Sequence, residues 1–83
     1  EKLLCPSHKI GEVLKMVRKL YENSLVDLTD GVKVILPHGW LHVRGSNTEP
    51  IIRLSAEADA PEQVRLISDS VFGLMRQLID TQK

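Results

Sequence analysis

The sequence predicts an α+β domain in which two helices pack on one face of a four-stranded antiparallel sheet, in the order αββββα. Two observations support that fold. Apolar residues recur every three or four positions near both ends of the chain, which is the period of an amphipathic helix. Between these segments lie four short runs of strand-forming residues with short turns between them, which is the pattern of an antiparallel meander.

The first helix is predicted over residues 7–22, where the apolar positions form one stripe. Ser7 is the expected capping residue, because its hydroxyl can accept a hydrogen bond from a free amide of the first turn. The stripe consists of Ile10, Val13, Leu14, Val17, Leu20 and Tyr21. The charged side chains expected on the solvent-facing side are Lys9, Glu12, Lys15, Arg18 and Lys19.

The four strands are predicted at residues 25–29, 32–36, 40–44 and 51–58. Asp30-Gly31, a strong hairpin signal, joins the first strand to the second. Side chains alternate between the two faces of a sheet, so Leu41 and Val43 are expected to point away from Arg44. One face of the sheet is therefore expected to be apolar and buried.

The second helix is predicted to begin in the segment Asp59-Ala60-Pro61, because proline suits the first helical turn. Its apolar stripe consists of Val64, Ile67, Val71, Leu74 and Leu78, and Phe72, Met75 and Ile79 widen it. Each helix has a single apolar side, so the two helices are expected to cover the same face of the sheet.

The composition limits the size of the protein and its partners. A chain of 83 residues is expected to form one domain over residues 1–83. Its 11 Lys and Arg residues balance its 11 Asp and Glu residues, so no net charge draws it to nucleic acid or to a membrane surface. Neither partner is expected, and any anion site must be local. The single cysteine, Cys5, excludes an internal disulfide and a thiolate metal cluster, and fits a cytoplasmic location.

One segment contains the residue types of an anion site: Arg44-Gly45-Ser46-Asn47-Thr48-Glu49-Pro50-Ile51-Ile52-Arg53. A phosphate group only accepts hydrogen bonds, so guanidinium groups, hydroxyls, amide side chains and free backbone N–H groups bind it. Gly45 and Asn47 both tolerate the left-handed backbone that aims successive N–H groups at one point. These residues are consistent with a phosphate-binding loop.

The same residues also fit interpretations without a ligand. Ser46 and Glu49 have the spacing of a capping box at the start of a helix, although Pro50 and the strand-like residues after it argue against a helix there. A polar hairpin loop with solvated arginines beside it is also common. Residue types alone leave the ordinary loop and the anion site both open.

Four segments carry a family resemblance: Asp30 to Val34, Gly39-Trp40, Val43 to Arg53 and Ala56-Glu57-Ala58. In them the chain resembles the C-terminal domain of the α-D-phosphohexomutases, the phosphomannomutase and phosphoglucomutase superfamily. The resemblance covers nearly the whole chain. The Ser-Asn-Thr-Glu-Pro form of the loop is most like phosphomannomutase/phosphoglucomutase, whereas phosphoglucosamine mutases usually have glycine in place of the asparagine.

The resemblance implies that this chain is domain four, with a TBP-like fold, of an enzyme that interconverts hexose 1- and 6-phosphates. In that family the domain binds the phosphate that is not transferred and closes over the active-site cleft. Position by position, the resemblance assigns phosphate binding to Arg44, Gly45, Ser46, Asn47 and Thr48, and a supporting role to Glu49 and Arg53. The implied partners are a hexose phosphate and the other three domains of the enzyme.

The resemblance also implies what this chain lacks. The family's phosphoserine, magnesium and sugar-recognition loops belong to the other domains, so no catalytic residue is expected here and the isolated chain is expected to be inactive. Magnesium and a hexose 1,6-bisphosphate activator would serve the whole enzyme, with neither bound by this domain alone. His38 and His42 have no third ligand near them, so no metal site is expected.

Two other functions compete with this interpretation. An α+β module can bind single-stranded RNA through aromatic side chains on its central strands, but only Trp40 could serve here. The chain could also be a structural or oligomer-forming module, in which the loop is an ordinary turn.

Overall fold

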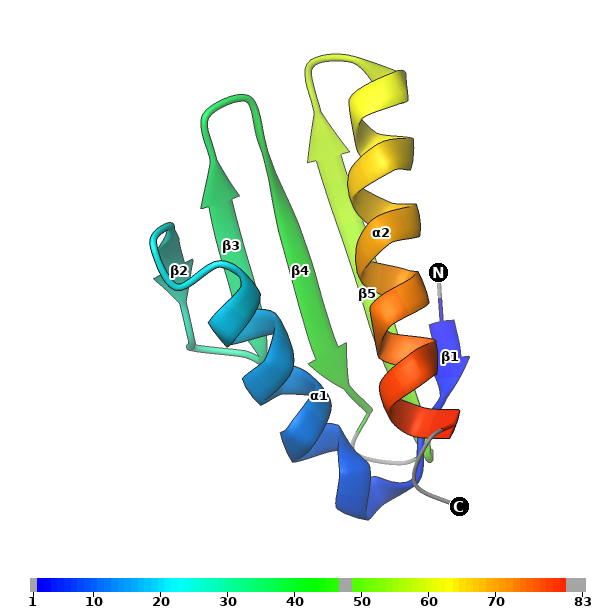
Figure 1. The fold of residues 1–83 in the computed structure, drawn as a ribbon. Coiled ribbons are helices and arrows are strands. Elements are labelled where there is room, and N and C mark those ends of the chain that lie inside the picture. Colours follow the sequence, from blue (N-terminus) through cyan, green and yellow to red (C-terminus); the bar gives the residue numbers. More distant parts are fainter. Residues whose placement is uncertain (1, 47–48, 81–83) are drawn as a thin grey trace.

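The computed structural model describes residues 2–46 and 49–80 and confirms the predicted α+β class (Figure 1). The elements are β1 Lys2–Leu4, α1 Ser7–Leu20, β2 Leu25–Asp27, β3 Val32–Leu36, β4 Gly39–Gly45, β5 Ile51–Ala58 and α2 Pro61–Asp80. All neighbouring strands are antiparallel, and the order across the sheet is β1-β5-β4-β3-β2. Both helices lie on the same face of this sheet, as predicted (Figure 1).

The sheet has five strands where the sequence predicts four. The additional strand, β1, pairs with the outer edge of β5, and its register places Lys2 opposite Arg53 and Leu4 opposite Ile51. A three-residue strand offers too few positions for an alternating pattern to be visible, so only the pairing reveals it. The Cys5 amide, which donates to the Pro50 carbonyl at 2.7 Å, extends this contact beyond the strand.

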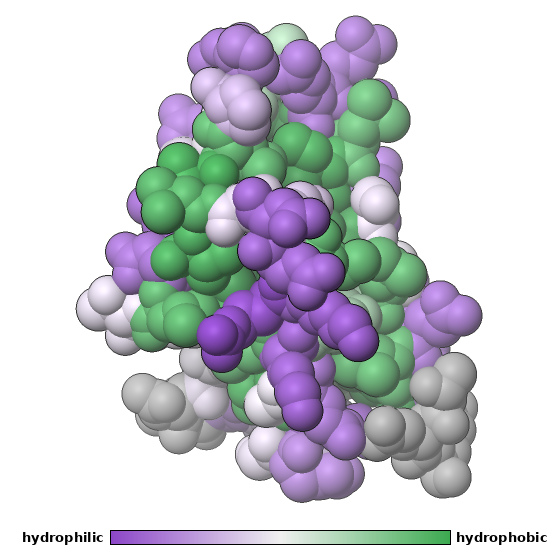
Figure 2. All heavy atoms as spheres, turned by 60° about the vertical axis from the view of Figure 1, so that its left-hand side comes forward, coloured by the Kyte–Doolittle hydropathy of each residue, from purple (hydrophilic) through white to green (hydrophobic). Residues whose placement is uncertain are grey.

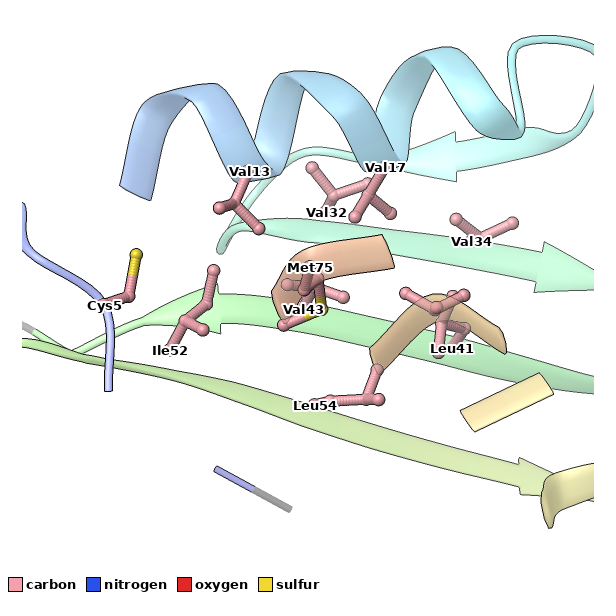
Figure 3. Close-up of a cluster of buried hydrophobic side chains, with 11 residues drawn as sticks. Cys5, Val13, Val17, Val32, Val34, Leu41, Val43, Ile52, Leu54 and Met75 are labelled. Carbon is pink, nitrogen blue, oxygen red and sulfur yellow. The ribbon is translucent and has the colours of Figure 1, made fainter. Parts of the chain in front are cut away.

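The core fills the space between the sheet and the two helices (Figure 3). It follows the predicted alternation, because β3, β4 and β5 each turn every second side chain toward the helices. Its members are at most 2% exposed: Cys5, Val13, Val17, Val32, Val34, Leu41, Val43, Ile52, Leu54, Val71 and Met75. The opposite face of the sheet is left uncovered by the two helices (Figure 1), and we call it the open face.

Two predictions about the start of α1 are wrong, and a third fails at its end, where Leu20, predicted in the apolar stripe, is 48% exposed. Ser7 is the first helical residue and not the cap; Pro6 occupies the cap position, no side chain caps the helix, and the Lys9 amide donates to the Pro6 carbonyl instead. Lys9, predicted on the solvent-facing side, is only 5% exposed. Its ammonium donates to the Ile79 carbonyl at 2.7 Å. The start of α1 lies beside the end of α2 (Figure 1), where helix carbonyls need donors, and this lysine supplies one.

Neither helix of the described residues combines the length and the apolar composition that crossing a membrane requires.

Candidate anion-binding site

The predicted anion-binding residues lie where β4 ends and β5 begins. Arg44 and Arg53 are direct partners across these two strands, and both are exposed. Because Val43 and Ile52 point into the core, the alternation of the strands places both arginines on the open face. The loop between the strands therefore starts and ends beside two guanidinium groups that the helices do not cover.

The base of this loop is held by short backbone hydrogen bonds. The Ser46 amide donates to the Ile51 carbonyl at 3.1 Å, and the Ile51 amide donates to the Glu49 carbonyl at 2.8 Å. The Ser46 hydroxyl accepts from the Glu49 amide at 3.3 Å. This last contact is half of a capping box, but a strand and not a helix follows, so the helical interpretation of the segment is wrong.

Gly45 fits the loop closely against α1. A Cβ atom at this position would lie 2.7 Å from a side-chain carbon of Ile10, so a larger residue would require the loop or the Ile10 side chain to shift. Gly45 does not adopt the left-handed backbone that it is expected to tolerate, since Gly31 is the only glycine with a positive φ among the described residues. The close approach to Ile10 is what favours a glycine at this position. Asn47 and Thr48, the other two predicted phosphate ligands, lie outside the described residues. Glu49, which follows them in the sequence, is exposed.

A third cation lies beside the two arginines. The register places Lys2 opposite Arg53, and Arg53 opposite Arg44, so three positively charged residues occupy neighbouring strands in one row. Neighbouring strands are about 4.8 Å apart, which is well within the distance over which such charges reinforce one another. Sequence reasoning missed Lys2, because nothing in the pattern of the chain predicts β1.

Arg44 has a partner of opposite charge in the β2–β3 hairpin. Its Nη1 lies 3.1 Å from Oδ2 of Asp30, and the two side chains are 50% and 64% exposed. The Nε2 atom of His42 also contacts this turn, at 2.6 Å from the Asp30 carbonyl oxygen. The hairpin therefore touches two neighbouring side chains of the open face, Arg44 and His42.

A comparison with known protein families decides what kind of domain carries this loop. The family model described as "Phosphoglucomutase/phosphomannomutase, C-terminal domain" matches residues 3–74. The chain belongs to this family. The matched range includes the whole sheet after Lys2 and the first two thirds of α2, so the loop, Arg44 and Arg53 are parts of a phosphohexomutase C-terminal domain, while Lys2 lies one residue before the match.

Individual relatives agree with the family. A "Probable phosphoglucosamine mutase" of Methanopyrus kandleri is 36% identical over 96% of this chain, which covers 18% of that protein. A "Phosphoglucomutase/phosphomannomutase" of Thermococcus kodakarensis is 52% identical over 68% of this chain, which covers 12% of that protein. The chain thus spans less than a fifth of the length of these relatives. Their names divide between phosphoglucosamine mutase and phosphoglucomutase/phosphomannomutase.

Other places in this C-terminal domain offer different chemistry. An apolar cavity of about 340 Å³ lies at the opposite end of β4, where its lining includes Tyr21, Leu36 and Ile67. Figure 2 shows the side of the molecule with β2 and α1, where apolar areas flank a band of polar side chains. Leu25 and Leu28 are among the exposed large apolar residues. The cavity lining is mostly apolar, and its side chains that can donate a hydrogen bond are Tyr21, His38 and Gln63.

Among the described residues, the remaining reactive side chains do not form a second site. Burial raises the pKa of the Cys5 thiol, and the residue is fully buried, so this sulfur does not resemble an activated nucleophile. His38 lies 3.4 Å from the Asp59 carboxylate, at the end of β4 opposite to Arg44. No group of three His, Cys, Asp or Glu side chains suited to a metal ion occurs among the residues that the structure describes.

Proposed function

We propose that this domain binds the phosphate of a hexose phosphate that is not being transferred, and closes over the active-site cleft of a phosphohexomutase that interconverts hexose 1- and 6-phosphates. The observation that carries the proposal is the position of Arg44. It is exposed at the end of β4, one residue before a loop whose base is held by backbone hydrogen bonds, in a chain that belongs to this family. The loop residues Ser46, Asn47 and Thr48 would supply the remaining donors.

The proposed chemistry is binding and orientation. A guanidinium group offers two parallel N–H donors to two phosphate oxygens, and its charge persists at every physiological pH. Arg53 and Lys2 raise the positive potential of the row without needing to touch the ligand, so they would favour the dianion at a distance. The binding energy obtained at the distant phosphate would then orient the sugar for a reaction that occurs elsewhere in the enzyme.

Binding of the phosphate group does not by itself determine which hexose is the substrate. The Ser-Asn-Thr-Glu-Pro loop resembles that of phosphomannomutase/phosphoglucomutase enzymes, which supports mannose and glucose phosphates as substrates. The relatives include probable phosphoglucosamine mutases, so glucosamine phosphate belongs in the same test. The family's magnesium ion and hexose 1,6-bisphosphate activator are proposed to act in the other domains, and the role proposed for this domain requires neither.

RNA binding is the less favoured function. Trp40 lies on β4 and is the only tryptophan, and the ammonium of Lys33 sits 4.9 Å from the centre of its ring. Because the Lys33 ammonium already occupies a face of this ring, the Trp40 side chain is poorly available for stacking with a base. The net charge of zero also differs from the basic composition typical of RNA-binding modules.

The test compares the full-length protein that contains this domain with the 83-residue chain. The full-length protein is expected to convert the 1-phosphates of mannose, glucose or glucosamine to their 6-phosphates in the presence of magnesium and a hexose 1,6-bisphosphate. The chain alone is expected to convert none of them. Turnover by the chain alone, or no turnover of any of the three by the full-length protein, would refute the proposal.

A further inference from the structure

We infer that Asp30 is a positioning residue that holds the guanidinium of Arg44 in place before the phosphate arrives. The inference rests on the proposed phosphate-binding function, and extends it to a residue outside the loop. Asp30 lies 14 residues before Arg44 in the sequence, in the turn of a different hairpin.

The geometry allows Arg44 to contact Asp30 and a phosphate at the same time. Only its Nη1 donates to Asp30, through Oδ2 at 3.1 Å. A guanidinium has five N–H donors, so the remaining edges can still meet a phosphate. Both side chains are at least half exposed, and such a pair contributes little to the stability of the fold. Its effect is therefore expected in the orientation of Arg44 and not in the melting temperature.

The turn that carries Asp30 is fixed against β4. Gly31 has a φ of 69°, in the left-handed region that favours glycine. A Cβ at Gly31 would overlap the Val43 carbonyl oxygen and lie within 2.9 Å of the Arg44 backbone and side chain, so the turn packs directly on the strand. On the other side, His42 Nε2 donates to the Asp30 carbonyl at 2.6 Å. Backbone packing thus places the Asp30 carboxylate beside Arg44 independently of their ion pair.

The connection between β2 and β3 is also held by Asp27, three residues before Asp30. The Asp27 carboxylate accepts from the Thr29 amide at 2.9 Å and from the Thr29 hydroxyl at 2.7 Å. A carboxylate on a braced turn restricts the rotamers of a long arginine side chain. Less side-chain entropy is then lost when the phosphate binds, which strengthens binding without any new contact.

The opposite role for Asp30 predicts the opposite change in activity, so the direction of the change distinguishes the two roles. If Asp30 only neutralised Arg44, a phosphate would have to compete with it, and removing the carboxylate would improve function. If Asp30 positions Arg44, removing it impairs function. We therefore compare Asp30→Ala and Asp30→Asn in the full-length enzyme. Asp59→Asn is the matched control, because Asp59 is another exposed carboxylate and lies at the far end of β4 and β5, beside His38.

Asp30→Ala is expected to lower kcat/KM about twofold to fivefold, the upper part of the range that an exposed ion pair contributes. Asp30→Asn keeps an oxygen that can accept from Nη1, so it should retain more activity than the alanine variant. Asp59→Asn should match the parent. An increase in kcat/KM in either Asp30 variant, or an alanine variant that equals the Asp59→Asn control, would overturn the inference.

A double-mutant cycle separates positioning from simple damage to the turn. If Asp30 acts through Arg44, then Asp30→Ala should have no further effect in an Arg44→Ala background. An undiminished loss in that background would show that the aspartate serves the hairpin and not the arginine, and the inference would be wrong.

A third measurement does not depend on phosphate binding at all. In the ligand-free 83-residue chain, NMR relaxation of the Arg44 Nε–H group should report a restricted side chain that Asp30→Ala releases. If the full-length protein proves inactive while this release is observed, the proposed function fails and the Asp30–Arg44 coupling stands. If Arg44 is equally mobile in the parent chain and in Asp30→Ala, Asp30 does not position Arg44, and the inference is wrong whether or not the proposed function is correct.

Discussion

The two faces of the sheet differ in what their residues contribute, although the same strands supply both. Val43 and Ile52 are fully buried on the face that α1 and α2 cover. Arg44 and Arg53, their neighbours in sequence, are exposed on the open face. One step along a strand therefore separates a residue that holds the fold together from a residue proposed to bind the ligand. Substitutions at adjacent positions should affect either stability or phosphate binding, but not both.

The largest effect is expected on the covered face, at Leu54. This residue is 2% exposed, and Leu54→Ala should cost about 2–5 kcal/mol through lost burial and the cavity that remains. That is a large share of the roughly 5–15 kcal/mol that stabilises an ordinary domain, so the melting temperature of the chain should fall steeply. The matched control is Ser55→Ala, one residue along β5 and exposed. Equal melting temperatures for Leu54→Ala and Ser55→Ala, measured by circular dichroism, would contradict the comparison.

The next effect is expected on the open face, at Arg44. Arg44→Ala in the full-length protein should lower kcat/KM about tenfold to a hundredfold, the loss of a hydrogen bond to a charged group worth about 1.5–3 kcal/mol. Arg44→Lys should recover only part of it, because an ammonium group cannot make the planar two-pronged contact.

The Arg44 substitution should leave the fold intact. An exposed strand-end arginine contributes little to the core, so the melting temperature of the chain should shift by no more than a few degrees. Because the phosphate orients the sugar as well as holding it, kcat should fall while KM rises. The assignment of Arg44 to the phosphate would be refuted by kinetic constants within twofold of the parent.

A smaller effect is expected where α1 meets α2. Lys9→Met keeps most of the side-chain volume but leaves the Ile79 carbonyl without its 2.7 Å donor, which should cost about 1–3 kcal/mol. Lys15→Met, on the exposed side of the same helix, is the control and should change the melting temperature little. Equal melting temperatures for the two variants would show that the buried ammonium does not stabilise the contact between the helices.

The smallest effect is expected from lowering the pH, which should weaken the hydrogen bonds of Asp27 in the β2–β3 hairpin. Hydrogen bonds from Thr29 hold the pKa of Asp27 below its usual value. The charged form is favoured in the folded chain, so this contribution is fully present above the pKa of the unfolded state, about 3.9, and is lost as the pH falls through the lower folded value. The Thr29 amide should therefore lose protection from hydrogen exchange as the pH falls below the unfolded value, about 3.9, and through the lowered pKa of Asp27. Asp27→Asn should remove this pH dependence, and a dependence that survived the substitution would show that the Asp27 carboxylate is not its cause.

Much of the fold follows from periodicity alone. The strand predicted at residues 51–58 is β5 in full, and the alternation along β4 correctly separates Leu41 and Val43 from Arg44. These features are visible in the sequence because a strand with one buried face repeats every two residues, and a helix with one buried side repeats every three or four. Local chemistry is enough to find them.

The features that the sequence did not predict depend on residues that are distant along the chain. β1 forms only because β5 offers it an edge, and Lys2 enters the row of cations through that pairing. Lys9 is buried because the end of α2 lies beside it, 70 residues later. The contact between Asp30 and Arg44 likewise requires the register of β3 on β4. The loop itself could be predicted from its residue types and family resemblance, but its neighbours could not.

The most direct test of the account is an NMR titration of the 83-residue chain with inorganic phosphate and with mannose 6-phosphate. Binding should be weak, on the order of millimolar, because one loop without the rest of the cleft offers few contacts. The account predicts amide shifts centred on residues 45–49, present for both ligands and abolished by Arg44→Ala, with little change around the apolar cavity at Leu36. Shifts that avoid residues 45–49, or that persist unchanged in Arg44→Ala, would contradict it.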